Sequence, residues 1–238
     1  MDPKDIIANT GKAMESKVVA ALGATPATGF DDLQQLLTLK GDNTGYTRVW
    51  YADRIKKISS MSIDIMPGKA RYFNLQIIPN DNLRVPRFVF EGLVMGHSSQ
   101  VSVDLYPDMD MVTNLDWLTS AYAGVNAYYD ELRKSDEFQL GVSRLPHMRT
   151  FCSPVFALAP AMSIDTVPAF EEAAGRYFDF WLAMFEQAQE CDSAEAAARA
   201  ERRKLISDAT IALDPDRKMV VGVYGEELTQ RIETAAMY

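Results

Sequence analysis

The chain has 238 residues, of which 47% are hydrophobic and 24% are charged, and its formal net charge is −9. These values are ordinary for a soluble globular protein with a sizeable core, and we expect one domain over residues 1–238. The acidic balance argues against a nucleic-acid partner, because phosphate backbones are bound by basic surfaces.

Cysteine and histidine usage points to a metal-free protein of a reducing compartment. Cys152 and Cys191 have neither the spacing of metal ligands nor that of a disulfide framework, and only two histidines are present. The start Met-Asp-Pro-Lys-Asp lacks the apolar segment of a signal peptide, and no apolar run approaches the ~20 residues that span a bilayer. We therefore expect a cytoplasmic protein without a membrane partner.

The first part of the chain predicts helix and then sheet. Apolar residues recur at helical spacing over residues 5–22, and residues 30–43 indicate a short helix or a loop. Short strand-like runs separated by turn residues follow, and connections this short favour antiparallel pairing. The predicted strands are Tyr46–Arg54, Ile58–Met66, Ala70–Pro79, Arg87–Met95 and Gln100–Tyr106.

The last two of these strands form a predicted hairpin within Pro86–Pro107, with a turn around Gly96. Its second strand alternates, so Val101, Val103 and Leu105 share one face while Ser102, Asp104 and Tyr106 share the other. A carboxylate at Asp104, within so apolar a strand, is costly unless it is paired, exposed or protonated.

The remainder of the chain is mainly helical. We expect helices over residues 113–134 and 168–190, a helix capped by Ser193 with the run Glu195–Asp208, and a last helix over Glu226–Met237. Prolines mark residues 140–159 as loop and edge strand. The order helix, strands, helices predicts an α+β fold, a three-layer α/β/α sandwich around an antiparallel sheet.

Few motifs carry chemistry in this sequence. Dinucleotide, Walker, HExxH and CxxC patterns are absent, which leaves three acids in apolar context, Glu91, Asp104 and Asp214. Asn74 and Gln76 share the polar face of the predicted sheet with Asp104, and such a face is compatible with a solvated surface and with a pocket. The most concentrated basic run is a solvated helix face or a dock for an acidic partner: Arg199, Arg202, Arg203 and Lys204.

Three stretches over about residues 45–238 resemble the ferredoxin-dependent bilin reductases. The first joins Val85-Pro86, Glu91 and the run from Val101 to Pro107, with Glu91 in place of the usual Asp. The second is Leu145-Pro146 with Phe151-Cys152-Ser153-Pro154. The third is Asp214-Pro215-Asp216-Arg217 with Tyr224-Gly225-Glu226-Glu227-Leu228.

This resemblance implies an enzyme that reduces biliverdin IXα with electrons from ferredoxin and binds no cofactor or metal. It implies an α/β/α sandwich, a monomer, with the bilin between the sheet and the C-terminal helices. Asp104 and Asp214 would be the catalytic proton donors, and a product of phycoerythrobilin through 15,16-dihydrobiliverdin is expected. The implied bilin contacts are Asn74, Gln76, Glu91, Arg149, Ser153 and Arg217, and Arg199, Arg202, Arg203 and Lys204 would attract ferredoxin.

Other functions fit the same residues. A two-electron reductase would stop at 15,16-dihydrobiliverdin, and Asn74, at a position where some members have His, bears on whether phycocyanobilin is formed instead. A non-catalytic tetrapyrrole or lipid carrier would use Asp104 only as a hydrogen-bond partner. A structural protein would use the aromatic helix Phe170–Phe185 as an interface. His147 is predicted to be a loop residue, and the sequence leaves open whether it lies at the surface or contacts the ligand.

Overall fold

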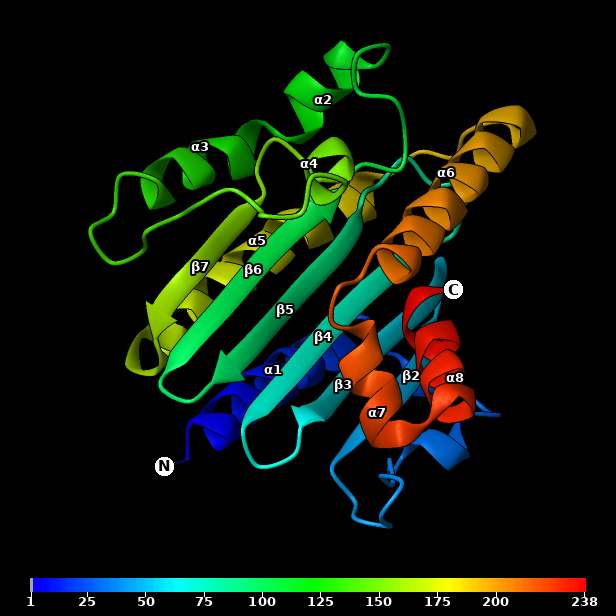
Figure 1. The fold of residues 1–238 in the computed structure, drawn as a ribbon. Helices are drawn as coiled ribbons and strands as arrows, with labels where there is room; N and C mark the ends of the chain where they lie inside the picture. Colours follow the sequence, from blue (N-terminus) through cyan, green and yellow to red (C-terminus); the bar gives the residue numbers. More distant parts are fainter. Residues whose placement is uncertain (1) are drawn as a thin grey trace.

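A seven-stranded antiparallel sheet organises the structure, a computed structural model that describes residues 2–238 (Figure 1). Each strand pairs with the next one along the chain, so the sheet is an uninterrupted meander. All five predicted strands are confirmed, the edge strand expected within residues 140–159 begins at Ala157, and a further edge strand at Thr25–Pro26 was not predicted. The strands are β1 (Thr25–Pro26), β2 (Gly45–Ala52), β3 (Ile55–Met66), β4 (Ala70–Pro79), β5 (Arg87–Met95), β6 (Ser98–Tyr106) and β7 (Ala157–Ser163).

Helices cover both faces of this sheet, which confirms the expected α/β/α sandwich (Figure 1). The back layer holds α1 (Pro3–Ala21) and α5 (Val167–Gln187), with α2 (Leu115–Ala121) and α3 (Ala123–Leu132) beside them. The front layer holds α4 (Met148–Phe151), α6 (Ser193–Ala212), α7 (Arg217–Tyr224) and α8 (Glu226–Met237). Two short 3-10 helices, η1 (Asp31–Leu33) and η2 (Ile164–Thr166), complete the fold.

The predicted hairpin lies beside β4, the central strand of the sheet. β5 and β6 pair over their whole length, from Arg87 opposite Tyr106 to Met95 opposite Ser98. Gly96 makes the turn at φ 63°, a left-handed conformation that glycine adopts without strain.

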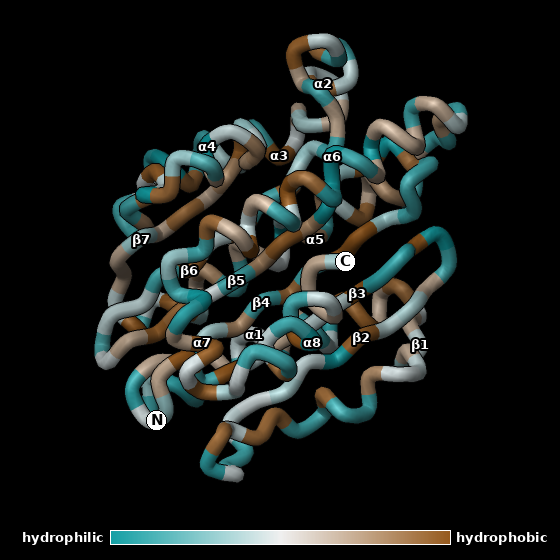
Figure 2. The backbone as a smooth tube through the Cα atoms, turned by 45° about the vertical axis from the view of Figure 1, so that its right-hand side comes forward, coloured by the Kyte–Doolittle hydropathy of each residue, from teal (hydrophilic) through white to brown (hydrophobic). Residues whose placement is uncertain are grey.

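The two faces of the central strands differ in chemistry, as the mixed colouring along the strands in Figure 2 indicates. The back face is apolar and buried: Phe73, Leu75, Ile77, Phe88, Phe90, Val94, Val101, Val103 and Leu105. The front face carries the intervening, mostly polar residues, among them Asn74, Gln76, Glu91 and Asp104. The back face therefore forms a dry core with α1 and α5, while the front face cannot be sealed in the same way.

Helix α5 is fixed on the back face by Trp181, which is fully buried. Its ring stacks between Phe178 and Phe185, and its indole Nε1 donates to the carbonyl of Pro86 at 2.8 Å. The aromatic stripe of this helix is therefore core, and its apolar face is not free to serve as an interface.

Three helix boundaries differ from the sequence prediction. The segment 113–134 is two helices that meet at Tyr122, whose hydroxyl donates to the carbonyl of Leu105 at 2.6 Å and draws this residue into the core. Asp192, not Ser193, caps α6, accepting from the backbone of Ala194 and Glu195. Helix α7, between α6 and α8, was not predicted as a separate helix.

The end of α8 is held by side chains of β3 and α6. Lys57 donates to the carbonyl of Thr234 at 3.2 Å, Ser59 to that of Ala236 at 3.1 Å, and Ser207 to that of Met237 at 2.9 Å. The carbonyl of Thr234 also accepts from the backbone N–H of Tyr238 at 3.3 Å, whereas those of Ala236 and Met237 lie at the helix end, where carbonyls lack partners within the helix. Burial lowers the pKa of Lys57 to about 7, because the charged amine is desolvated.

We expect Gly92→Ala to destabilise the sheet. A Cβ at Gly92 would lie 2.6 Å from the ring of Phe73 and 3.1 Å from Ile7, both in the buried core, so overpacking should cost about 1–3 kcal/mol of unfolding free energy. Gly222→Ala in α7 is the matched control, since a Cβ there meets nothing within 4 Å and alanine favours helix by up to ~1 kcal/mol. Urea unfolding measures both; equal stability of the two variants would contradict this packing.

Candidate functional site

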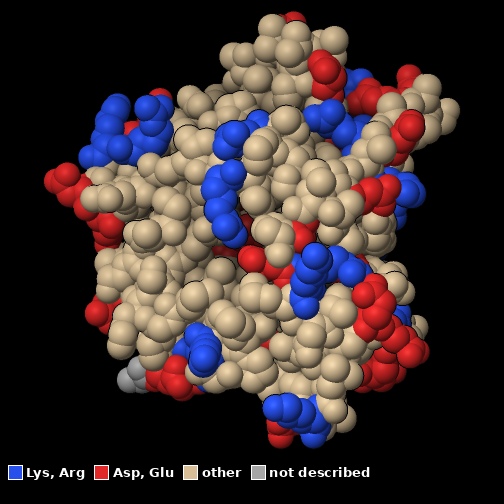
Figure 3. Space-filling view, in the orientation of Figure 1, with Lys and Arg blue, Asp and Glu red and all other residues tan. Residues whose placement is uncertain are grey.

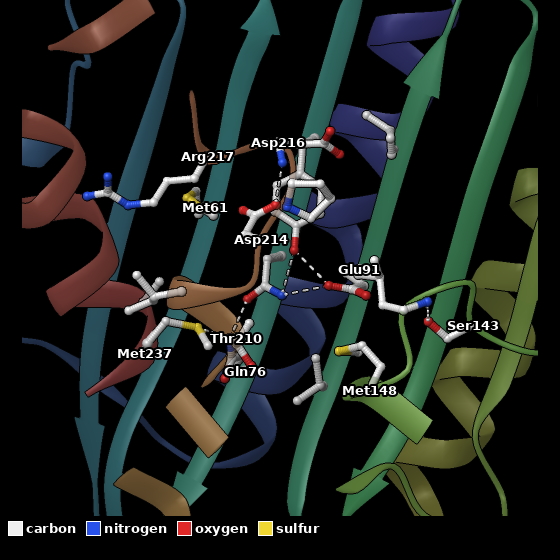
Figure 4. Close-up of a pocket in the computed structure, with 18 of the residues that line it drawn as sticks. Met61, Gln76, Glu91, Ser143, Met148, Thr210, Asp214, Asp216, Arg217 and Met237 are labelled. Atoms are coloured by element: carbon white, nitrogen blue, oxygen red, sulfur yellow. Dashed lines mark hydrogen bonds between the residues drawn. The ribbon is translucent and has the colours of Figure 1, made fainter. Parts of the chain in front are cut away.

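A cavity of about 430 Å³ lies between the front face of the sheet and the front helices (Figure 4). Its floor is formed by β3, β4, β5 and β6, one wall by the segment around α4, and the other by α6, α7 and α8. Apolar side chains from every wall line it, with a smaller set of polar groups among them. The apolar members include Met61, Ile63, Leu93, Met148, Leu158, Ile206, Val220 and Met237.

Glu91 of β5 is the acid of the cavity floor. Its Oε2 accepts from the hydroxyl of Tyr72 at 2.7 Å and from Asn74 Nδ2 at 3.3 Å, and its Oε1 accepts from Ser102 Oγ at 3.1 Å. The side chain is half-buried and lines the cavity. It is thus a positioned carboxylate that faces a ligand-sized space rather than an outward strand residue.

The amides of β4 extend this network along the floor. Gln76 Nε2 donates to Asn74 Oδ1 at 2.9 Å and approaches the sulfur of Met237 at 3.3 Å. Asn74 in turn donates to Tyr72 Oη at 3.1 Å. Both predicted residues line the cavity, joined to Glu91 by hydrogen bonds.

Asp214 enters the cavity from the opposite side, on the connection between α6 and α7. Figure 4 shows it across from Glu91, with its carboxyl directed inward and held by the backbone N–H of Asp216 at 2.8 Å. Burial of the carboxyl raises the pKa of Asp214, an effect that the N–H of Asp216 opposes and the charges of Asp216 and Glu233 reinforce. The site therefore presents one acid on its floor, Glu91, and another on the wall formed by α6, α7 and α8, Asp214.

The structure does not bring Asp104 into this cavity, contrary to its expected place beside the ligand. Its carboxyl accepts from the backbone N–H of Ser153 at 3.0 Å, from the Ser153 hydroxyl, and from the N–H of Leu105 at 2.8 Å. Residues Cys152 and Ser153 contact the carboxyl, and the residue is only 1% exposed. The expected buried, proton-holding acid is nonetheless present, because burial raises the pKa of Asp104 to about 7 against these hydrogen bonds.

Three predicted ligand contacts have other partners. Ser153 binds Asp104 and does not line the cavity. Arg149 is exposed outside the cavity and donates to the carbonyl of Ser143 at 2.7 Å. Arg217 lines the cavity, but Figure 4 shows it turned toward α8, where it pairs with Glu233 at 2.6 Å and Glu226 at 2.7 Å.

The predicted basic docking patch is wrong for two of its four residues. Arg199 and Arg203 are buried, because α6 turns this side toward the sheet. Arg203 pairs with Asp108 and, at 2.9 Å, with Asp81, and Arg199 donates to the carbonyl of Val85 at 2.9 Å. Of the other two, Lys204 is exposed but pairs with Asp208, and Arg202 donates to the carbonyl of Pro107.

The sequence analysis missed several residues of the cavity, among them Tyr72, Arg87 and Met148, and had left the contact of His147 open. The alternation that singled out Asn74 and Gln76 also reaches Tyr72 on β4, and the same alternation from Glu91 reaches Arg87 on β5. This signal was available. The place of Met148 and His147 depends on how the segment before β7 folds back, which no short-range pattern specifies.

The surface around the site is mixed in charge. Figure 3 views the front face and shows basic and acidic side chains adjoining near its centre. Within residues 2–238, no group of three or more His, Cys, Asp or Glu side chains is placed to hold a metal ion. Over the same residues, no helix has the length and apolar character needed to cross a bilayer.

Comparison with known proteins finds similarity in structure but none in sequence. No protein-family model matches the chain, and no curated protein matches it in sequence. Among solved structures, it is similar to the selenomethionine form of phytochromobilin synthase from tomato, solved in complex with biliverdin. The TM-score is 0.81 at 16% sequence identity, over 92% of this chain and 77% of the tomato chain, so the two share a fold.

The buried carboxyl of Asp104 predicts a pH dependence of stability. Because its pKa is about 7 when folded and near 3.8 when unfolded, the stabilisation from its proton is complete below about pH 4 and is lost as the pH rises through 7. The Asp104→Asn variant cannot ionise at this position. The unfolding free energy of the wild type minus that of this variant should therefore fall by about 4 kcal/mol between pH 4 and pH 8.

Urea unfolding at several pH values measures this difference. Asp130→Asn is the control, since Asp130 is an exposed acid paired with Arg133. If the difference between the wild type and Asp104→Asn stays constant with pH, the Asp104 carboxyl is ionised throughout.

Proposed function

We propose that this chain is a ferredoxin-dependent bilin reductase that converts biliverdin IXα to phycoerythrobilin through 15,16-dihydrobiliverdin. The observation that carries the proposal is the cavity between the sheet and the C-terminal helices, with Glu91 and Asp214 on facing sides. Its volume of about 430 Å³ lies within the ~300–1,000 Å³ of small-molecule sites. The fold shared with tomato phytochromobilin synthase, which was solved with biliverdin, supports the same assignment.

The chemistry requires the protein to place protons rather than electrons. Reduction of each double bond takes two electrons, delivered one at a time by iron–sulfur ferredoxin, and two protons. Each electron makes the conjugated bilin more basic, so an acid at the correct carbon determines which bond is reduced. The apolar walls hold the four rings and exclude water, while Glu91 lies within reach of pyrrole N–H groups.

In this proposal the acids have other roles than those expected from the sequence. Glu91, not Asp104, is the sheet acid that contacts the ligand in this proposal, with Tyr72 and Asn74 orienting it. Asp104 is a positioning residue, because it holds Ser153 and thereby the α4 wall. Asp214 donates protons to the bilin from the wall formed by α6, α7 and α8. Because it lies in an exposed connection, it exchanges protons with solvent between steps.

Replacing Glu91 by Gln should leave biliverdin bound but slow its reduction by at least ~100-fold, because the amide can neither take up a proton nor pass one on to the reduced bilin. Anaerobic turnover with reduced ferredoxin, followed by absorption spectra and pigment chromatography, measures the rate. Asp208→Asn, at an exposed acid of α6, is the control and should reduce biliverdin at the wild-type rate. A Glu91→Gln enzyme that works at full speed would remove Glu91 from the mechanism.

Asp214→Asn should let the first reduction proceed and then stall, so that 15,16-dihydrobiliverdin accumulates. The reason is that Asp214 and Glu91 reach the bilin from different sides, and each serves a different double bond. Product analysis over time distinguishes this from a uniform slowing of both steps. A full yield of phycoerythrobilin from this variant would reject the assignment.

The wild-type spectrum also tests the function as a whole. A pigment with one reduced bond, or phycocyanobilin, would identify a different reductase of the same kind. Biliverdin that binds but shows the same spectrum with and without reduced ferredoxin would identify a non-catalytic carrier instead.

A further inference from the structure

Arg87, at the start of β5, lines the cavity with a buried guanidinium that lies over the ring of Tyr106 and, within residues 2–238, has no hydrogen-bonded acid. The residue is 1% exposed, and its Nε and Nη2 have no hydrogen-bond acceptor. Its Nη1 reaches only Gln76 Oε1, at 3.5 Å. Arginine stays protonated in proteins, so a positive charge with two unused donors lies in the wall of the cavity.

The surroundings of Arg87 are electropositive as well. Arg199 and Arg203 are buried with Asp108, whose charge acts on all three arginines. Arg203 occupies one oxygen of Asp108 and also pairs with Asp81, and the other Asp108 oxygen accepts no hydrogen bond from Arg87. Three buried arginines thus share two acids, which leaves a local excess of positive charge.

An unpaired buried guanidinium is expensive, because a charge removed from water is compensated only by an opposite charge and by hydrogen bonds. The planar fork of arginine matches the two oxygens of a carboxylate. The unused donors lie in the wall of a cavity large enough for a ligand, so a ligand is the natural source of that carboxylate.

We propose that Arg87 is a carboxylate receptor at the inner end of the cavity. The source of the carboxylate is either a propionate of the bound bilin or a small free acid that occupies the site beside it. The first source rests on the proposed function and deepens it, because the bilin would enter with one propionate directed inward to Arg87. Arg144, which is exposed at the cavity rim, would be left for the outer propionate.

The test is a cycle that combines Arg87→Met with removal of the charge from the ligand. Biliverdin and its dimethyl ester are titrated into the wild type and the variant without ferredoxin, and binding is followed by bilin absorption. We expect the ester to bind the wild type at least ~10-fold more weakly than the free acid. The Arg87→Met variant should lose most of this difference, because the two changes remove the same interaction, and what is left reports the outer propionate at Arg144.

A second arm distinguishes the free acid as source. If sodium propionate raises the Tm of the wild type but not of the Arg87→Met variant, while acid and ester bind alike, the receptor takes a separate carboxylate. If acid and ester bind alike and propionate has no effect, Arg87 is not a carboxylate receptor, even where biliverdin is bound and reduced. Failure of the proposed function is seen separately, as biliverdin that binds but is not turned over.

The Tm of the protein without ligand tests whether the role of Arg87 is purely structural. Arg87→Met removes an unpaired buried charge, so the Tm of this variant without ligand should equal or exceed that of the wild type. A marked fall would mean that Arg87 serves the fold, and would overturn the proposal.

Arg133→Met, at an exposed arginine paired with Asp130, is the control for the binding test and should leave the acid-to-ester ratio unchanged. Arg87→Lys, which keeps the charge without the fork, should retain part of that ratio.

Discussion

The alternation of side chains along β4, β5 and β6 is the constraint on which the rest of the structure depends. Because neighbouring residues point to opposite faces, the run Phe88, Phe90 and Val94 faces the back helices while Arg87 and Glu91 face the front. A shift of one residue would exchange the two sets. The dry back layer fixes this register, and the polar front face then requires a cover that leaves space for a ligand.

Two apolar clusters pack that cover on the sheet, one under α7 and α8 and the other under α4 and α6, and charged and polar contacts fix it further. Asp104 holds Ser153 beside α4, and Lys57, Ser59 and Ser207 bind the last carbonyls of α8. The acid that sequence analysis placed at the ligand is thus one layer removed from it, where it shapes the wall of the cavity. The two buried charged residues of this face differ in their partners. Asp104 orders the chain by binding Ser153, whereas Arg87 has no hydrogen-bonded acid in the described part of the chain.

The strands and most helices were predictable from the sequence, because alternation and helical spacing are local properties. The terminal helix over Glu226–Met237 was predicted with the correct bounds, and the five inner strands were all found. The burial of Arg199 and Arg203 was not predictable, since their spacing on α6 fits a solvated face equally well. The place of Asp104 outside the cavity depends on its contacts with Cys152 and Ser153, long-range contacts that no motif encodes.

The order of elements along the chain has a consequence for biosynthesis. The sheet and both back helices are complete by Gln187, whereas α6, α7 and α8, which form one side of the cavity, emerge from the ribosome last. During that interval the nascent molecule exposes the front face, where amides, acids and arginines interrupt the apolar side chains. The polar and charged residues of this face lower its tendency to associate with neighbouring chains, whereas the apolar residues that α7 and α8 later cover, among them Ile63 and Ile65, stay exposed until those helices form.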